Sequence, residues 1–180
     1  MEKQIAYYCA PALAGIKPSN IMSVYKNKTD DIKEKIEKLN AELNPKGIFV
    51  EILCECDKKF LVMVYRKKIL EEILCKDEVK SFLAERGYPE SGKVEDYLEI
   101  LKEHLKNEAF PHEIGAFLGY PMHDIYGFMY HKDEGCLLCG EWKVYENADA
   151  AEKLFYRFNR CRRALCEKID GGKSLSQVFC

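Results

Sequence analysis

Two cysteines separated by two residues, Cys136 and Cys139, form the pattern in this sequence that most suggests chemistry. Cysteines at this spacing can share a metal ion or cycle between a dithiol and a disulfide. A structural zinc site needs four ligands, and the chain has no second Cys-x-x-Cys pair. We therefore predict that Cys9 and His112 complete a site for iron or zinc. The alternative is a structural pair of buried cysteines at the start of a strand.

His112 and Glu113 follow a proline that suits the start of a helix. Together they could act as a general acid–base pair. Alternatively, Glu113 only stabilises the helix N-terminus and His112 only packs. The chain has no serine-hydrolase elbow, metalloprotease helix or dinucleotide fingerprint, which excludes the enzyme classes that these motifs identify.

A stripe of basic residues follows one side of the predicted C-terminal helix. Residues 151–168 hold six basic and two acidic side chains. Such a stripe is either a solvated face or a docking surface for an anion or an acidic protein. The whole chain has a net charge of −2, which argues against a nucleic-acid partner. The predicted partner-binding residues are Lys153, Arg157, Arg160 and Arg163.

The composition predicts one globular domain over residues 1–180. The chain is 47% hydrophobic and 32% charged, as folded domains are. Its nine cysteines are odd in number and irregularly spaced, so they do not suggest the disulfide framework of a secreted protein. No apolar run approaches the roughly 20 residues that span a bilayer, and the N-terminus does not match a signal peptide. We expect a cytoplasmic protein.

Hydrophobic periodicity predicts an α+β fold with a small mixed or antiparallel sheet, several helices and a long C-terminal helix. The opening residues 5–25 read as irregular and partly extended, because Pro11 and Pro18 oppose a continuous helix. Cys54 and Cys56 are predicted to face the core. The predicted strands are 48–56, 60–66 and Leu137–Tyr145, and the predicted helices are Asp31–Leu43, Lys67–Leu74, Asp77–Arg86, 94–105, Pro111–Leu118, Met122–Tyr130 and Ala148–Ile169.

Several linked motifs resemble a known family. They are Phe110-Pro-His-Glu-Ile-Gly115, Phe117-Leu-Gly-Tyr-Pro121, Cys139-Gly-Glu-Trp-Lys-Val-Tyr145 and the opening Cys9-Ala-Pro-Ala-Leu-Ala-Gly-Ile-Lys17. The chain resembles, over nearly its whole length, the uncharacterised family of clostridial anaerobes called domain of unknown function 3793. The resemblance implies an intracellular bacterial protein encoded near flavodoxins and iron-handling proteins. It supplies no catalytic residues, so its motif residues are candidates only: Cys9, Lys17, His112, Glu113, Cys139 and Trp142.

The first of three hypotheses is a metal- or redox-linked accessory protein. Its cysteines would bind iron, zinc or a cofactor, or would exchange electrons as a dithiol. The basic side of the last helix would receive an acidic partner of the flavodoxin type.

The second hypothesis is an enzyme of unrecognised class that acts on a small molecule. Its pocket would gather the opening segment, the turn at residues 111–115 and the strand near residue 142, with Trp142 contacting a cofactor. The catalytic candidates would be Lys17, His112, Glu113 and Lys143. The third hypothesis is a non-enzymatic binding module in which the motifs serve packing and turns.

Overall fold

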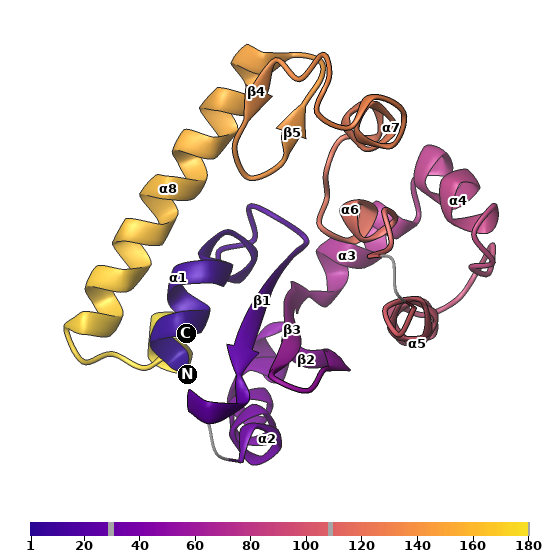
Figure 1. Cartoon of the computed structure of the whole chain (residues 1–180). Helices are drawn as coiled ribbons and strands as arrows, with labels where there is room; N and C mark the ends of the chain where they lie inside the picture. The colour runs from indigo at the N-terminus through magenta and orange to yellow at the C-terminus, as the bar shows by residue number, and fades with distance from the viewer. Residues whose placement is uncertain (29–30, 108–109, 180) are drawn as a thin grey trace.

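A three-stranded antiparallel sheet with helices on both faces organises the chain (Figure 1). The computed structural model describes residues 1–28, 31–107 and 110–179. The sheet order is β1-β3-β2, with β1 at Ser19–Tyr25, β2 at Ile48–Glu55 and β3 at Lys59–Arg66. The α+β class, the small antiparallel sheet and the long C-terminal helix are thereby confirmed.

The central strand β3 pairs with a neighbour along each edge, and a hydrophobic core covers each of its two faces. Val62 and Val64 face one hydrophobic core, and Met63 and Tyr65 face the other. This alternation follows from the two-residue period of a strand. A β-bulge near Leu53 shifts the register of β2.

The bulge changes which residues of β2 are buried. Leu53 is buried, whereas Cys54 is half-buried and Cys56 is exposed. The predicted core position of Cys56 is therefore wrong. The extra residue reverses the alternation that the sequence pattern extends through this strand.

The first core lies between one face of the sheet and a layer that joins both ends of the chain. Helix α8 runs beside α1 in Figure 1, and Cys161 of α8 contacts the carbonyl of Ala10 in α1. The backbone N–H of Leu175 donates to Glu2, which ties the C-terminal turn to the start of α1. The helices of this layer are α1 (Glu2–Leu13), α2 (Ile32–Leu43), α8 (Ala148–Asp170) and α9 (Leu175–Val178).

The helix α1 corrects the prediction of an irregular opening. Pro11 lies in its last turns, where its missing N–H leaves the carbonyl of Tyr7 without a helical partner. The Nε of Arg162 on α8 donates to that carbonyl at 2.8 Å. A tertiary contact thus replaces the hydrogen bond that proline removes.

The second core lies on the opposite face of the sheet, between the strands and the middle of the chain. Its fully buried residues include Leu70, Phe82 and Phe117. The predicted helix at Pro111–Leu118 is shorter than expected, since residues 111–113 form a turn. The helices are α3 (Lys67–Leu74), α4 (Asp77–Ala84), α5 (Val94–His104), α6 (Ile114–Phe117) and α7 (Met122–His131), with short 3-10 turns at Lys26–Lys28 and Asn44–Lys46.

A small hairpin joins α7 to α8 in place of the single strand predicted at Leu137–Tyr145. Its strands are β4 (Leu138–Cys139) and β5 (Lys143–Val144), which pair in antiparallel fashion. Gly140 lies at the turn and packs under the ring of Phe155 of α8. No helix in the described residues is both long and apolar enough to cross a membrane.

Candidate functional site

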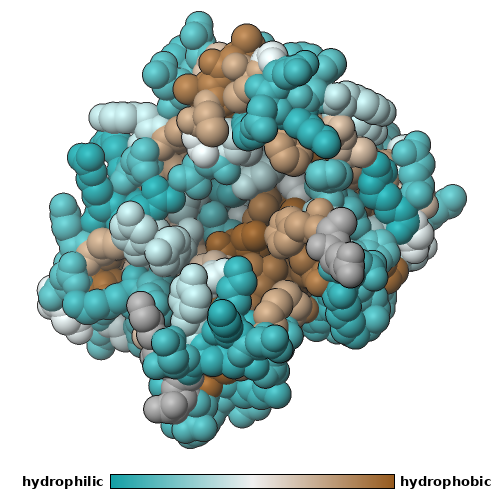
Figure 2. Space-filling model, viewed as in Figure 1, coloured by the Kyte–Doolittle hydropathy of each residue, from teal (hydrophilic) through white to brown (hydrophobic). Residues whose placement is uncertain are grey.

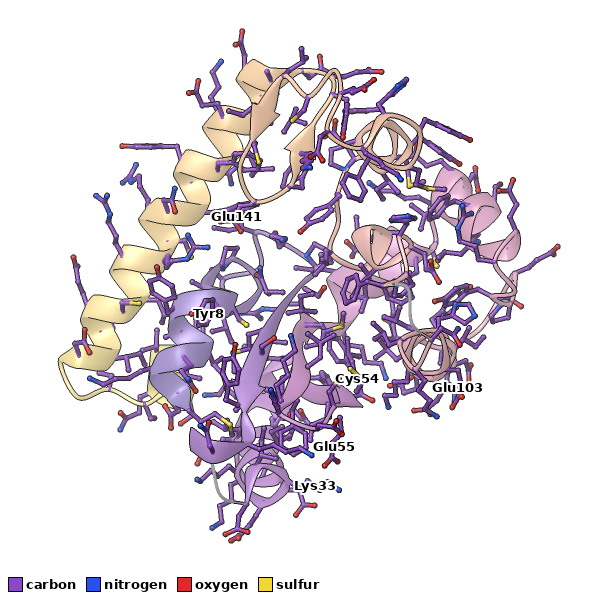
Figure 3. All side chains as sticks on the ribbon, in the orientation of Figure 1. Tyr8, Lys33, Cys54, Glu55, Glu103 and Glu141 are labelled. Carbon is purple, nitrogen blue, oxygen red and sulfur yellow. The ribbon has the colours of Figure 1, made fainter. Side chains whose placement is uncertain are left out.

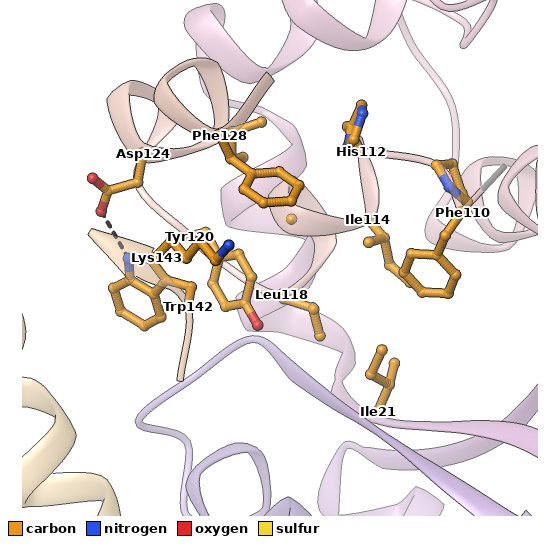
Figure 4. A pocket seen from close by; sticks show the side chains of 13 residues that line it. Ile21, Phe110, His112, Ile114, Leu118, Tyr120, Asp124, Phe128, Trp142 and Lys143 are labelled. Atoms are coloured by element: carbon orange, nitrogen blue, oxygen red, sulfur yellow. Dashed lines mark hydrogen bonds between the residues drawn. The ribbon is translucent and has the colours of Figure 1, made fainter. Parts of the chain in front are cut away.

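A cavity of about 300 Å³ opens beside α6 and α7 (Figure 4). Ile21 of β1, Leu118 after α6 and Phe128 of α7 contribute apolar walls. The turn before α6 adds Phe110 and Pro111 to the lining. Figure 2 shows apolar side chains in a hollow near the centre of this face of the molecule. The motif at residues 110–115 and the strand β5 therefore meet at one site, although about 30 residues separate them in the chain.

The aromatic rim of this cavity is unusually exposed. Phe110 is 55% exposed and Phe128 is 37% exposed. Covering such exposed apolar surface is favourable, by about 25 cal/mol for each Å² that is removed from water. The cavity thus offers apolar surface that a ligand could cover.

Two basic side chains, His112 and Lys143, lie on either side of the Phe128 ring (Figure 4). The imidazole of His112 meets that ring edge-on, with the ring centroids 5.6 Å apart. Within the described part of the chain, the imidazole makes no hydrogen bond. The Nζ of Lys143 is 5.3 Å from the ring centroid and pairs with the exposed carboxylate of Asp133.

Asp124 fixes the wall that carries Lys143. Its buried carboxylate accepts hydrogen bonds from Nε1 of Trp142 and from the backbone N–H of Tyr145, both at 2.7 Å. These contacts join the first turn of α7 to β5 on either side of Lys143. No sequence pattern singles out Asp124, since an acidic residue in a first helical turn ordinarily indicates only a favourable interaction with the helix dipole.

Trp142, the predicted cofactor-binding candidate, forms part of the cavity wall. Its ring lies 4.8 Å from Tyr120 and 4.6 Å from Phe155, measured between centroids. The side chain is only 9% exposed. The indole therefore closes the site and packs against α8 at the same time.

Glu113 is not brought to the cavity with His112. Its carboxylate is buried, and Oε1 lies 2.6 Å from Nδ1 of His104 on α5. The hydroxyl of Tyr88 lies 3.5 Å from the same oxygen. The two neighbours in sequence thus face different surroundings, and the predicted acid–base pair of His112 and Glu113 is not assembled.

Lys17 lies in a second cavity, of about 420 Å³, on the α1 side of Tyr120. The residue is 4% exposed. Its Nζ is 5.0 Å from the centroid of the Tyr120 ring and 5.6 Å from that of Phe158. Burial lowers the pKa of this amine from 10.5 to about 8, and the charge of Glu141 partly offsets that effect.

The four predicted metal ligands are not gathered. Cys9 is fully buried in α1, and this burial raises the pKa of its thiol to about 12. Cys136 is half-buried, and its Sγ donates to the carbonyl of Leu138 at 3.2 Å, whereas Cys139 is exposed. His112 belongs to the cavity beside α6. Across residues 1–28, 31–107 and 110–179, no three His, Cys, Asp or Glu side chains form a group that could hold a metal.

The predicted partner-binding residues of α8 are all exposed: Lys153, Arg157, Arg160 and Arg163. Their role in docking an acidic protein stays a prediction. The neighbouring Arg162 is instead half-buried, and its guanidinium donates to Glu141 at 2.9 Å. In the sequence Arg162 is one of the six basic residues of the segment 151–168, and no pattern there indicates that it turns toward α1 and the β4–β5 hairpin.

The comparisons with known proteins agree with the resemblance of the motifs. The model of a family described as "Protein of unknown function (DUF3793)" matches residues 5–179. The chain therefore belongs to this family. Searches of curated proteins and of solved structures gave no match.

Proposed function

Since the chain is a member of a family of unknown function, we propose from its geometry that it binds a small, flat, largely apolar organic acid. The proposed site is the cavity beside α6 and α7. The observation that carries the proposal is an apolar cavity with two convergent basic side chains, His112 and Lys143. Concave apolar sites with a few placed polar groups are the usual form of small-molecule sites.

The apolar lining selects the body of the ligand. Phe110, Ile114, Leu118 and Phe128 surround the cavity, and two of these are aromatic rings that can pack against a flat molecule. The volume of about 300 Å³ lies at the lower end of the range for ligand sites. A one- or two-ring compound suits this size better than a nucleotide.

The basic groups select an acidic substituent. The partner of Lys143, Asp133, has a side chain that is 84% exposed. Exposed ion pairs contribute only about 0–1 kcal/mol, so a ligand carboxylate can replace Asp133 at low cost. The imidazole of His112 can then donate to a second oxygen of the ligand.

Hydrogen bonds and close packing hold the walls of the cavity in place, as expected of a binding site. Asp124 holds β5 against α7 through Trp142 and Tyr145, and Gly115 lets α6 approach Ile125 closely. Side chains locked by such contacts lose little entropy when a ligand arrives. The site is therefore organised before binding.

The test uses naphthalene-2-carboxylate as a probe and Trp142 as the reporter. Trp142 is the only tryptophan, so its indole N–H gives one cross-peak in a ¹⁵N–¹H spectrum. Titration should shift this peak in a saturable manner. Calorimetry should show that the carboxylate binds at least about fivefold more tightly than naphthalene-2-carboxamide, a difference of about 1 kcal/mol.

Matched variants locate the site. Lys143→Met should abolish the preference for the carboxylate over the carboxamide, whereas Lys153→Met, which changes an exposed lysine of α8, should preserve it. Ile21→Phe should fill the cavity and weaken both probes. An indole peak that stays still at saturating probe, or equal binding to the Ile21→Phe variant, would refute the proposal.

A second candidate function is the redox role of Cys136 and Cys139. The structure shows them as unbridged thiols at the two ends of a short segment, one half-buried and one exposed. An exposed thiol can form a disulfide under oxidation with a second thiol close to it in the sequence. Oxidation with glutathione disulfide followed by peptide mapping should give a Cys136–Cys139 bond; mixed disulfides spread over all exposed cysteines would exclude this role.

A further inference from the structure

The side chain of Lys17 is only 4% exposed, and its amine makes no hydrogen bond or ion pair with the described residues. Since no fully buried side-chain nitrogen among these residues lacks a partner, the amine reaches the cavity that Lys17 lines. The nearest interactions are with the faces of Tyr120 and Phe158. Buried lysines are rare unless paired, because removing an ammonium ion from water is costly. Burial lowers the pKa of this amine to about 8, so a larger fraction of it is neutral and nucleophilic near pH 7 than for an exposed lysine.

Lys17 lines a cavity that can admit a reactant. The lining also includes Tyr8 of α1 and Glu141 at the turn of the β4–β5 hairpin, both labelled in Figure 3. Nζ itself lies over the rings of Tyr120 and Phe158, and these two contacts position it. The cavity thus presents a positioned amine to a small molecule.

The charged groups around Lys17 argue against a simple anion site. The Arg162 guanidinium is already engaged by Glu141, the carbonyl of Tyr7 and Oδ1 of Asn159. Glu141 places a carboxylate in the same cavity, where it would repel an anionic ligand. The thiol of Cys9 faces Lys17 from α1, and burial keeps it protonated.

We propose that Lys17 forms an imine with the carbonyl group of a small aldehyde or ketone that enters this cavity. The observations that carry this step are the near-complete burial of the Lys17 side chain, the lack of an ion-pair partner for its amine and its place in the cavity wall. Desolvated lysines in enzymes act as nucleophiles of this kind.

The step balances without a further reactant. The lone pair of the neutral amine forms the C–N bond, while the carbonyl π electrons move to oxygen. One proton passes from nitrogen to that oxygen and gives a carbinolamine. A second proton, taken from solvent, lets the oxygen leave as water while the nitrogen lone pair forms the C=N bond. The product is a positively charged iminium beside the carboxylate of Glu141 and the two aromatic faces.

This site is distinct from the proposed acid-binding cavity, although Ile21, Leu118 and Tyr120 contribute to both. The naphthoate titration depends on Lys143 and reports through Trp142. The imine depends on Lys17 and is detected by a covalent mark. Failure of either result therefore leaves the other intact.

The experiment treats the full chain with propanal and sodium cyanoborohydride, which reduces C=N bonds and leaves a propyl group on the amine that formed the imine. Peptide mass spectrometry then locates the propyl groups. At pH 7 the neutral fraction of an amine with a pKa of about 8 exceeds that of an ordinary lysine by about three hundredfold. We expect Lys17 to be labelled first, at least tenfold faster than Lys153.

Two outcomes would overturn the proposal. The first outcome is labelling that is spread evenly over the exposed lysines and leaves Lys17 unmodified, and observing it requires no variant. The second outcome is early labelling of a folded Lys17→Met variant that equals the early labelling of the wild type. The Lys153→Met variant serves as the control and should retain the rapid label.

Discussion

The buried carboxylate of Asp124 accepts a hydrogen bond of 2.7 Å from the indole nitrogen of Trp142. The same carboxylate accepts one from the backbone of Tyr145, so a single side chain bridges α7 and β5. This bridge fixes the wall of the cavity that carries Lys143. The relationship joins two residues that are 18 positions apart and lie on different elements.

Replacing Asp124 should destabilise the fold strongly. The Asp124→Ala change leaves the buried indole N–H of Trp142 and the part-buried backbone N–H of Tyr145 unpaired, and each costs about 1–3 kcal/mol. We expect the free energy of unfolding to fall by about 3 kcal/mol in urea titrations. Asp133→Ala, which removes an exposed carboxylate, should change it by less than about 1 kcal/mol. Equal losses in the two variants would contradict the bridging role of Asp124.

Gly140 should not tolerate a side chain. A Cβ at this position would lie 2.3 Å from the ring of Phe155, which packs against Trp142. Overpacking of this kind costs about 1–3 kcal/mol, so Gly140→Ala should lower the thermal midpoint by several degrees. Gly171→Ala is the control, since its Cβ meets no atom closer than 3.3 Å. The Phe155→Leu change should recover part of the loss in the double variant, and its failure to do so would place the strain elsewhere.

The pKa of Lys17 predicts how stability depends on pH. Burial lowers this pKa from 10.5 to about 8, so the unfolded chain binds more protons than the folded chain between these values. The free energy of unfolding contributed by Lys17 therefore rises with pH across this window, by up to about 3 kcal/mol. Cys9 acts in the opposite sense, because its pKa is raised from 9.0 to about 12 and the unfolded thiol ionises first.

Comparison with Lys17→Met separates these two effects. Cys9 is present in both proteins, and so are Glu141 and Arg162, the other charged groups that act on Lys17. Urea titrations from pH 7 to pH 10 should show the variant more stable at pH 7, with the difference shrinking as pH rises. A difference that does not change with pH would mean that Lys17 keeps its ordinary pKa in the folded chain.

Thiol reactivity should follow burial. Cys139 is exposed, whereas Cys9 is fully buried with a raised pKa. Because the thiolate is the reactive form, iodoacetamide should modify Cys139 at least about a hundredfold faster than Cys9 at pH 8. Peptide mapping over time measures both rates. In urea, where the chain is unfolded, the rates for Cys139 and Cys9 should converge. Equal rates without urea would contradict the prediction and show that α1 opens readily.

Much of the fold follows from the sequence because hydrophobic periodicity reports which face of an element is buried. Helix α2 begins one residue from its predicted start and ends at Leu43 as predicted. The hairpin of β2 and β3 and the long helix α8 also lie close to their predicted positions. These elements bury one stripe or alternate side chains, and such patterns are local properties of the chain.

The predictions from sequence are wrong where a contact with a distant part of the chain overrides a local conformational preference. Pro11 argues against a helix, yet α1 includes it because Arg162 satisfies the exposed carbonyl of Tyr7. Nothing near Pro11 in the sequence indicates an arginine about 150 positions away. The predicted strand at Leu137–Tyr145 becomes a hairpin, in which Gly140 allows the close approach of Phe155.

The sequence by itself determined the α+β class, the main elements and the motif residues His112, Trp142, Lys143 and Lys17 as candidates. Only the tertiary structure decided which of them meet. It placed His112 and Lys143 at one cavity and Lys17 at another, and it turned Glu113 toward His104. The reason is physical: residue types set which chemistry is possible, whereas distance, burial and hydrogen-bond partners are set by packing between elements far apart in the chain.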